Sequence, residues 1–541
     1  MNIVEGNIID LKNREIYPGE IHIANGRIAQ IRKNSKSYES YICPGFIDAH
    51  VHIESSMLTP ENFSRLIIKH GTIAIVNDPH EIANVMGIPG IDYMMENSKR
   101  SSVKCFFGIP SCVPATPFDA SGCTIDSSDV EQMAKSGKFI ALSEMMNVPG
   151  VLYNDVEVIR KINTAKRYNL PIDGHAPNLQ GEDLFKYANS GITTDHETIS
   201  VEEGLQKIAT GMKIIIREGS AAKNYDILKP LIKTNPESIL FCTDDAHPDE
   251  IIKLGHIDRI VKMALKDGFD LFDVLKIASK NAIDHYHLPV GCLQEGDYAD
   301  FIRIDDLSSF RIQEVYIHGE KKFDVMDKNA AIVENATHQI VYPNNFYHSK
   351  ISLSDITCEV KDKILAIGTK TDQLWTSKME FDIIPAPNFE SDIERDILKI
   401  VYVNRYLNLP PQIAYIHGVG ITNGAFGSSI SHDSHNILAV GTTDSDIVDV
   451  INEIIDNKGA LVVKSKEKLH SLPLPIAGIM SDQRAESVAR KYEELNEILQ
   501  KSGSKLQSPF MTLAFMSLLV IPEIKIGEKG LFDYTKFDFI E

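Results

Sequence analysis

Residues 45 to about 285 alternate between strand-like and helix-like patterns, and this alternation limits the possible folds more than any other feature. Helical patterns such as Asp155–Tyr168 and Gly181–Asn189 separate short apolar runs. Eight such units in about 240 residues match a (β/α)8 barrel, which typically has about 250. A doubly wound open sheet is the alternative, but no Gly-x-Gly-x-x-Gly follows the first strand. The eight candidate strands are residues 45–53, 72–78, 103–110, 139–144, 171–177, 191–197, 213–219 and 239–245.

Both flanks of this region have β character. Residues 1–44 contain short apolar strands and an Asn25-Gly26 hairpin turn, and residues 286–339 return to strand patterns after a polar, turn-rich stretch. We expect the two flanks to pair into one small β domain. Residues 340–541 read as a further α/β domain. The predicted fold class is therefore α/β, with a barrel at 45–285, a small β domain from both of its sides, and an extra C-terminal domain.

Charge and cysteine content limit the partners and the compartment. The 541 residues carry a formal net charge of −20, which argues against a nucleic-acid backbone or an anionic membrane as a partner. The seven Cys are odd in number and include no Cys-x-x-Cys, so we expect a reducing compartment. The start of the chain does not resemble a signal peptide, and the most apolar segment, 510–521, is well short of the ~20 residues that span a bilayer. The predicted location is the cytoplasm.

Metal-ligand residue types follow several of the predicted strands. Because the strand ends of such a barrel share one rim, these side chains are expected to meet there. A single histidine at a strand end is more often structural, but six ligand types at one rim are hard to explain in that way. The set is His50, His52, Glu144, His175, His196 and Asp244.

Six imidazole and carboxylate ligands are too many for one tetrahedral ion but suit two ions about 3.5–4 Å apart. His50, His52 and Asp244 would hold one ion, and His175 and His196 the other. The sixth ligand, Glu144, would bridge them. Such ions lower the pKa of water toward ~7, so hydroxide is available for attack.

At this point the residues resemble the amidohydrolase superfamily, and within it the adenine deaminase family. The superfamily resemblance lies in residues 44–52, PGFIDAHVH, and in the later strand ends. The family resemblance is sharper and covers nearly the whole chain. It lies in residues 52–57 (HIESSM), 77–85 (NDPHEIANV), 242–245 (CTDD) and 431–436 (SHDSHN).

The resemblance implies hydrolysis of adenine to hypoxanthine and ammonia at a two-metal centre, in purine salvage. It implies manganese, with Fe2+ or Zn2+ as alternatives, and a homodimer. The six ligands carry over, with Asp244, Glu144 and His196 as catalytic residues. Asp244 would pass the proton of the attacking hydroxide toward the departing ammonia. Hydantoinases and dihydroorotases usually have a carboxylated lysine where this chain has Glu144, which weighs against ring opening.

Two rival functions stay open. The first is another amidohydrolase reaction on a cyclic amide or amidine, and the second is a barrel scaffold that has lost catalysis. A zinc nucleobase deaminase of the His-x-Glu and Pro-Cys-x-x-Cys type is excluded, because His52-Ile53-Glu54 mimics its first half but no Pro-Cys-x-x-Cys follows.

Asp78 and Glu81 follow the second strand and are the predicted substrate-binding residues. Protonation of adenine N1 eases attack at C6, so an acid close to N1 is expected. Asp78 could instead cap the helix that starts near Pro79.

Several neighbouring residues have two interpretations. Asp245 is expected to support the ligand Asp244 rather than replace it, although the two could exchange roles. His80 and His247 are interpreted as structural or supporting residues near the rim. Segment 431–436 either approaches the barrel mouth, as part of a partner subunit for example, or forms an internally hydrogen-bonded turn, and we favour the turn.

Overall fold

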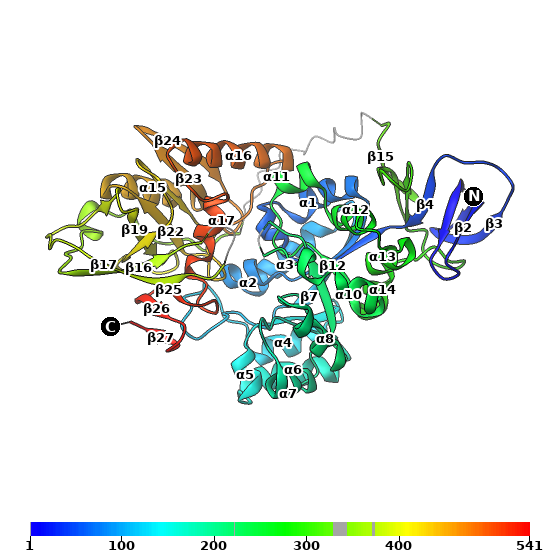
Figure 1. Cartoon of the computed structure of the whole chain (residues 1–541), viewed down its shortest axis with the longest axis horizontal. Coiled ribbons are helices and arrows are strands. Elements are labelled where there is room, and N and C mark those ends of the chain that lie inside the picture. The colour runs from blue at the N-terminus through cyan, green and yellow to red at the C-terminus, as the bar shows by residue number, and fades with distance from the viewer. Residues whose placement is uncertain (1, 221, 328–342, 371–373, 541) are drawn as a thin grey trace.

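Eight parallel strands lie at the centre of the molecule (Figure 1). The computed structural model describes residues 2–220, 222–327, 343–370 and 374–540. The strands form a five-stranded sheet in the order β5-β6-β7-β8-β9 and a three-stranded sheet in the order β10-β11-β12. Their bounds are Phe46–Val51 (β5), Thr72–Asn77 (β6), Lys104–Ile109 (β7), Ala141–Met145 (β8), Ile172–Gly174 (β9), Thr194–Asp195 (β10), Lys213–Arg217 (β11) and Ile239–Cys242 (β12).

Backbone hydrogen bonds join the two sheets at both ends. The N–H of Thr193, just before β10, donates to the carbonyl of Ile172 in β9 at 2.8 Å. At the other end, the N–H of Asp244, just after β12, donates to the carbonyl of His50 in β5 at 3.0 Å. The arrangement is a TIM-barrel-like fold in which consecutive strands are spatial neighbours.

Burial on both faces explains the apolar runs in these strands. Every residue of β5 and β6 is buried, as expected for parallel strands between a core and covering helices. β9 and β10 are shorter than predicted. One reason is that a side chain replaces backbone pairing, because the N–H of Gly174 donates to Oγ1 of Thr194 at 3.3 Å.

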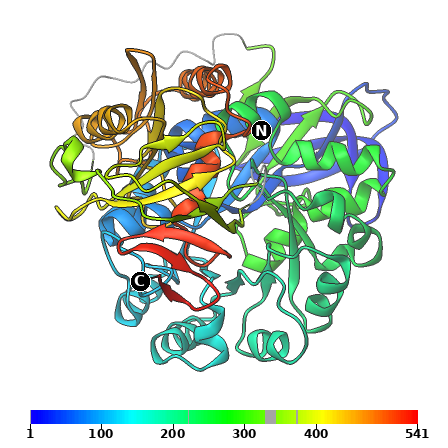
Figure 2. The same ribbon diagram turned by 60° about the vertical axis from the view of Figure 1, so that its left-hand side comes forward.

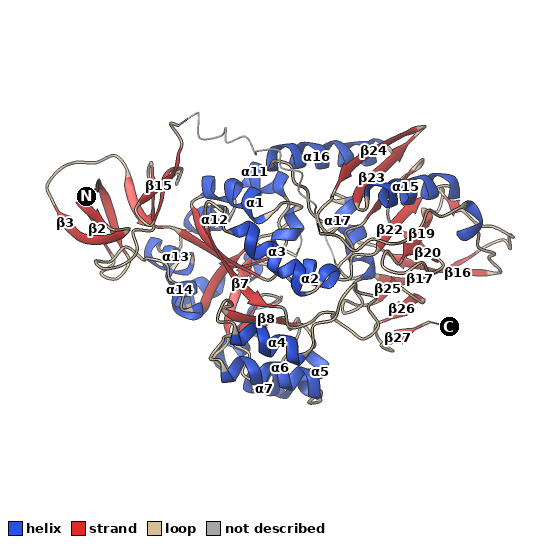
Figure 3. Ribbon diagram, turned by 180° about the vertical axis from the view of Figure 1, so that it is seen from behind, coloured by secondary structure: helices blue, strands red, loops and turns tan. Residues whose placement is uncertain are grey.

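Helices cover the outside of the strands (Figure 3). Local capping defines several of their starts; for example, Thr59 accepts the N–H of Asn62 ahead of the first helix, which has Pro60 at its first position. The bounds are Pro60–Ile67 (α1), His80–Met86 (α2), Ile88–Ser98 (α3), Ser127–Lys135 (α4), Val148–Leu152 (α5), Val156–Arg167 (α6), Gly181–Asn189 (α7), Val201–Ala209 (α8), Tyr225–Leu228 (α9), Pro230–Thr234 (α10), Pro248–Leu254 (α11), Ile257–Lys266 (α12), Leu271–Ile277 (α13) and Lys280–Tyr286 (α14).

One seven-stranded sheet combines strands from before and after the barrel, in the order β15-β14-β13-β4-β1-β2-β3. The two parts meet where β13 pairs antiparallel with β4, Phe301 opposite Pro44. The predicted boundary at 339/340 lies outside the described residues. The strands are Asn2–Asp10 (β1), Glu15–Ala24 (β2), Arg27–Lys33 (β3), Tyr41–Pro44 (β4), Phe301–Ile304 (β13), Ile312–Ile317 (β14) and Glu320–Asp324 (β15).

The C-terminal part of the chain lies on the side of the barrel opposite the seven-stranded sheet (Figure 1) and covers part of the barrel in the turned view (Figure 2). It contains a nine-stranded sheet and a small three-stranded sheet, β25-β26-β27. None of the helices in the described residues is long and apolar enough to cross a membrane.

The nine-stranded sheet has the order β17-β16-β20-β19-β22-β21-β23-β24, with β18 paired to β19. The helices are Asp444–Asn457 (α15), Ala485–Lys501 (α16) and Pro509–Ala514 (α17). The strands are Lys363–Gly368 (β16), Ser377–Asp382 (β17), Ser391–Asp392 (β18), Ile397–Val403 (β19), Gln412–His417 (β20), Ala425–Ser428 (β21), Ile437–Gly441 (β22), Ala460–Ser465 (β23), Lys468–Pro473 (β24), Ile524–Gly527 (β25), Gly530–Asp533 (β26) and Asp538–Phe539 (β27).

Candidate metal centre

The end of β5 brings two imidazoles together. His50 and His52 are separated by one residue, so both point to the same side, and their Nε2 atoms are 3.2 Å apart. Nδ1 of His52 lies 3.1 Å from the backbone carbonyl of Asp78. A donated hydrogen bond there leaves the lone pair on Nε2, as metal-ligating histidines require.

Asp244 completes this first group from the segment just after β12. Its Oδ1 lies 3.4 Å from Nε2 of His50 and 3.2 Å from Nε2 of His52. Asp244 has a left-handed backbone, with φ of 55°, so the strand pattern does not continue through it. Asp245 also borders the cavity here, although a regular strand would turn it away. Its Oδ1 accepts a hydrogen bond from Ser55 at 2.5 Å, which is a supporting contact.

Glu144, at the end of β8, connects this group with a second one. Its Oε1 is 3.2 Å from Nε2 of His52. Its Oε2 is 2.8 Å from Nδ1 of His175 and 3.2 Å from Nε2 of His196. The two oxygens of one buried carboxylate therefore face two separate sets of ligand atoms, and all six predicted ligands meet at one rim.

The charges at this rim favour bound cations. Burial alone would raise the pKa of Glu144, but hydrogen bonds from His175 and His196 hold that pKa well below its usual value. Burial opposes ionisation of Asp244 as well, but Arg217 together with His50 and His52 outweighs it and keeps that pKa well below the usual value. Ionised carboxylates together with imidazoles form a donor set that suits Zn2+, Mn2+ or Fe2+.

Two further charged residues, Arg217 and Glu197, lie at this site and were not predicted. Arg217 ends β11, and its Nη1 and Nη2 lie 2.5 Å and 2.9 Å from the two carboxylate oxygens of Glu197. Nη1 of Arg217 also contacts Oδ2 of Asp244. The arginine thereby fixes the side of Asp244 that faces away from the histidines. The available signal was its position, because Arg217 lies two residues before the end of the predicted strand 213–219, close to the same rim.

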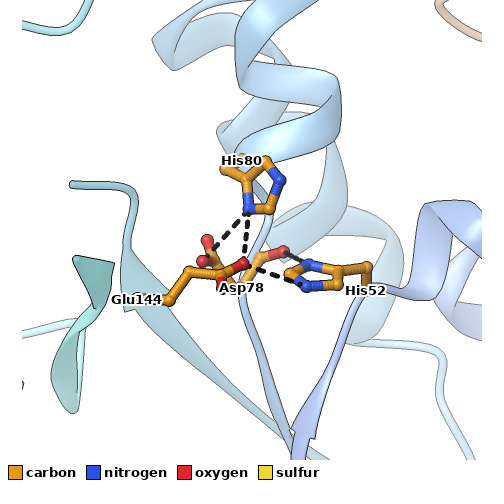
Figure 4. Close-up of side chains that lie close together, drawn as sticks. All are labelled: His52, Asp78, His80 and Glu144. Atoms are coloured by element: carbon orange, nitrogen blue, oxygen red, sulfur yellow. Dashed lines mark hydrogen bonds and ion pairs between the residues drawn. The ribbon is translucent and has the colours of Figure 1, made fainter. Parts of the chain in front are cut away.

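Asp78 and His80 lie beside the centre, next to Glu144 (Figure 4). Nδ1 of His80 is 3.2 Å from Oδ2 of Asp78 and 3.4 Å from Oε1 of Glu144. The carboxylate of Asp78 does not cap α2, because the N-cap of that helix is Pro79 and no side chain of the described residues caps it. The helix-cap interpretation of Asp78 is therefore wrong, and His80 is closer to the centre than expected.

Segment 431–436 reaches the barrel mouth within the same chain. Nδ1 of His432 lies 2.5 Å from Oε1 of Glu81, and Nε2 of His435 contacts Oε2. An internal hydrogen bond also exists, from the N–H of His435 to the carbonyl of Ser431 at 2.6 Å. The preferred interpretation, a turn serving only its own domain, is wrong because both of its histidines bind a barrel carboxylate.

His247 lies farther from the centre than the six ligands. It is absent from the cavity at the centre and instead lines a second cavity of about 680 Å³ between α11 and α16. Its ring meets Tyr492 edge to face, with centroids 4.7 Å apart. These contacts agree with the structural role expected for this histidine.

Two family models match the chain. The amidohydrolase family matches residues 41–322, and the adenine deaminase C-terminal domain matches residues 373–538. The first match covers the TIM-barrel-like region together with strands β13 and β14.

Curated relatives match over the whole length. An adenine deaminase from Methanosarcina barkeri is 46% identical over 100% of this chain and 99% of its own length. An adenine deaminase from Borreliella burgdorferi is 47% identical, covering 99% of both chains. Among solved structures the likeness is weaker: a beta-aspartyl dipeptidase from Fervidobacterium islandicum AW-1 gives a TM-score of 0.46 at 17% identity, covering 62% of this chain and 98% of the other.

Proposed function

The chain belongs to the adenine deaminase family of the amidohydrolases, and we propose that the strand-end histidines and carboxylates described above form its catalytic centre. The reaction is hydrolysis of adenine to hypoxanthine and ammonia. The observation that supports this centre is the position of Glu144, whose two oxygens face two groups of ligands.

The family uses divalent metal ions, and the donor set fits them. We propose two ions, with manganese preferred and Fe2+ or Zn2+ as alternatives. His50, His52 and Asp244 would hold one, and His175 and His196 the other, with Glu144 shared. When bound, such ions supply Lewis acidity that makes hydroxide available near neutral pH.

Asp244 is the proposed proton carrier. Its ionised carboxylate is held between two histidines on one side and Arg217 on the other. A fixed, ionised carboxylate can accept the proton of the attacking water and pass it to the departing amino group. His196 stacks on His50 with ring centroids 4.3 Å apart, so the two groups of ligands support each other's orientation.

Asp78 and Glu81 are proposed to take part in purine binding, Asp78 directly and Glu81 through neighbouring histidines. The carboxylate of Asp78 is buried and pairs with His80 through Oδ2, whereas Oδ1 has no hydrogen-bond partner among the described residues, as expected of an oxygen that receives a substrate nitrogen. In its protonated form it can donate to N1. Glu81 lines the cavity, but both of its oxygens already contact histidines, so it is proposed to act through them.

Further proposals concern architecture and setting. The hydrogen bonds at both sheet ends support one closed eight-stranded barrel. The family supports a homodimer, and seven free cysteines fit a cytoplasmic protein. The proposed division is 1–44 and 286–339 for the small β domain, 45–285 for the barrel, and 340–541 for the C-terminal domain.

The test is ammonia release from a panel of substrates by protein loaded with manganese. Adenine is expected to turn over, and hydantoin and dihydroorotate are expected to be inert. A cyclic amide that reacts while adenine does not would overturn the proposal. Protein that holds under one equivalent of metal after manganese supplementation, and turns nothing over, would instead indicate an inactive scaffold.

A further inference from the structure

The cavity at the metal centre has walls from two distant parts of the chain. Barrel residues, including the proposed ligands His52 and Asp244, form one side. The other side comes from the C-terminal part, where apolar residues such as Phe515, Leu518 and Ile521 lie beside His432. Segments separated by several hundred residues therefore enclose one space.

This combination suits a flat heteroaromatic base. Apolar side chains cover a ring face, while a few fixed polar groups meet its edge. If C6 of adenine faces the barrel ligands, a ring edge that carries further nitrogen acceptors faces the opposite wall. His432 is the imidazole that the C-terminal part supplies to that wall.

His432 is held rigidly on three sides. Nδ1 contacts Glu81 at 2.5 Å, and the ring stacks on Phe515 with centroids 4.6 Å apart and planes at 19°. The backbone N–H of His432 donates to the carbonyl of Ala514 at 2.9 Å. The residue is 4% exposed. A side chain fixed in this way loses little conformational freedom when a ligand arrives.

His435 has a different role, although it binds the same carboxylate. The N–H of Ser431 donates to Nδ1 of His435 at 3.3 Å, so the proton of a neutral ring lies on Nε2, which contacts Glu81. Burial lowers the pKa of His435 to about 4, whereas Glu81 outweighs the effect of burial on His432 and raises that pKa to about 9. His435 does not line the cavity, and His432 does.

We propose that the C-terminal domain contributes His432 to the adenine site, where the Nε2–H of its imidazolium, whose Nδ1 contacts Glu81, donates a hydrogen bond to a ring nitrogen other than N1 while Phe515 and Leu518 cover the ring face. Glu81 then acts indirectly, by holding His432 in place together with His435. This inference rests on the proposed function. It makes the C-terminal domain a part of the substrate site.

The primary test compares His432→Asn with the wild type, both loaded with manganese. Loss of a hydrogen bond from a charged donor corresponds to about a ten- to hundredfold weaker interaction. KM for adenine is expected to rise by that factor, with kcat changed less and the metal content unchanged. An unchanged KM would overturn the proposal. His470→Asn is the matched control, because His470 belongs to the same domain but pairs with Glu494 outside the cavity.

Inhibition by deaza bases separates a direct contact from a structural effect. 3-Deazaadenine and 7-deazaadenine each lack one ring nitrogen, and their inhibition constants are measured against adenine. For the base that lacks the partner nitrogen, His432→Asn and wild type are expected to have equal inhibition constants. Full loss of affinity for both bases would show that His432 acts on the fold alone.

The wild type by itself gives a second measurement if the variant does not fold, because it should bind one deaza base about tenfold or more weakly than the other. Turnover of adenine by the wild type tests the proposed function separately.

Discussion

At the scale of single residues, Arg217 controls the proposed proton carrier. It is the largest favourable influence on the ionisation of Asp244 and also forms a two-point ion pair with Glu197. Such buried pairs are best removed as a unit, because a lone buried charge is costly. The double variant Arg217→Gln/Glu197→Gln therefore removes the arginine without leaving the charge of Glu197 unpaired, although it also removes a carboxylate close to His175 and His196.

The double variant is expected to move the acid limb of the pH profile upward. Arg217 lowers the pKa of Asp244, so its removal raises that pKa, and more of Asp244 is protonated at a given low pH. If activity requires the ionised form, kcat/KM falls at a higher pH than in the wild type. The measurement is kcat/KM between about pH 5 and 9. Arg259→Gln serves as control, since Arg259 pairs with Glu218 away from the centre; identical acid limbs in all three proteins would contradict the role given to Arg217.

Residue patterns predicted that the six proposed ligands meet at one rim, but they did not predict Arg217 and Glu197 beside them. Alternation along a strand places His50 and His52 on one side, and parallel strands end at one rim, so local rules were sufficient. The partners of Arg217 could not be predicted, because several carboxylates follow the neighbouring strands and only packing selects Glu197 and Asp244. The sequence does not decide whether Asp78 caps a helix or binds the substrate, because an Asp just before Pro79 is compatible with both roles.

At the scale of elements, α8 is attached to the barrel by a buried charge cluster. Nζ of Lys207 lies 2.8 Å from Asp195 at the end of β10 and 2.6 Å from Glu203 within the helix. All three side chains are fully buried. Burial opposes ionisation of Asp195, but Lys207 together with His196 and Thr198 outweighs it and lowers that pKa to about 2.

Lys207→Met is expected to destabilise the protein by about 3–5 kcal/mol at pH 7, because Asp195 and Glu203 would remain buried without a cation. The lowered pKa of Asp195 means that its stabilising contribution is present above about pH 4 and lost as the pH falls toward about 2. The difference between wild type and variant should shrink over that interval. Urea unfolding at several pH values measures this difference in stability.

The control is Lys186→Met, which removes an exposed ion pair with Asp183 and should change the free energy of unfolding by less than about 0.5 kcal/mol. An equal effect of the two substitutions would contradict the stabilising role given to Lys207.

Element patterns predicted the positions of the eight strands well. The lengths of β9 and β10 were overestimated, since a side chain of Thr194 substitutes for backbone pairing there. The destination of segment 431–436 could not be inferred locally. Its small polar residues predict a turn, and the turn exists, but its contact with Glu81 spans about 350 positions and depends on how the domains pack.

At the scale of the whole molecule, the proposed metal centre ties together five strands. Its ligands come from β5, β8 and the segments that follow β9, β10 and β12, and its carboxylates repel one another without cations. Bound ions should therefore stabilise the entire TIM-barrel-like region. A ligand at a hundred times its dissociation constant stabilises by about 2.7 kcal/mol.

Removal of metal with a chelator is expected to lower the melting temperature, and manganese should restore it. Differential scanning calorimetry measures both, under the same buffer and protein concentration. The variant His50→Asn/His52→Asn, which lacks two proposed ligands, should respond much less to manganese. A melting temperature that is the same with and without metal in the wild type would contradict the proposed centre.

The seven-stranded sheet has a consequence for the order in which the protein is made. β4 ends at Pro44 and pairs with β13, which begins at Phe301. A ribosome that adds about 5–20 residues per second needs roughly 13–50 s to synthesise the intervening stretch. The hairpins of β1, β2 and β3 can form early, whereas β4 has an open edge until the barrel has been translated. Nascent chains stalled before residue 301 should therefore be more prone to aggregation and to chaperone binding than chains stalled after residue 324.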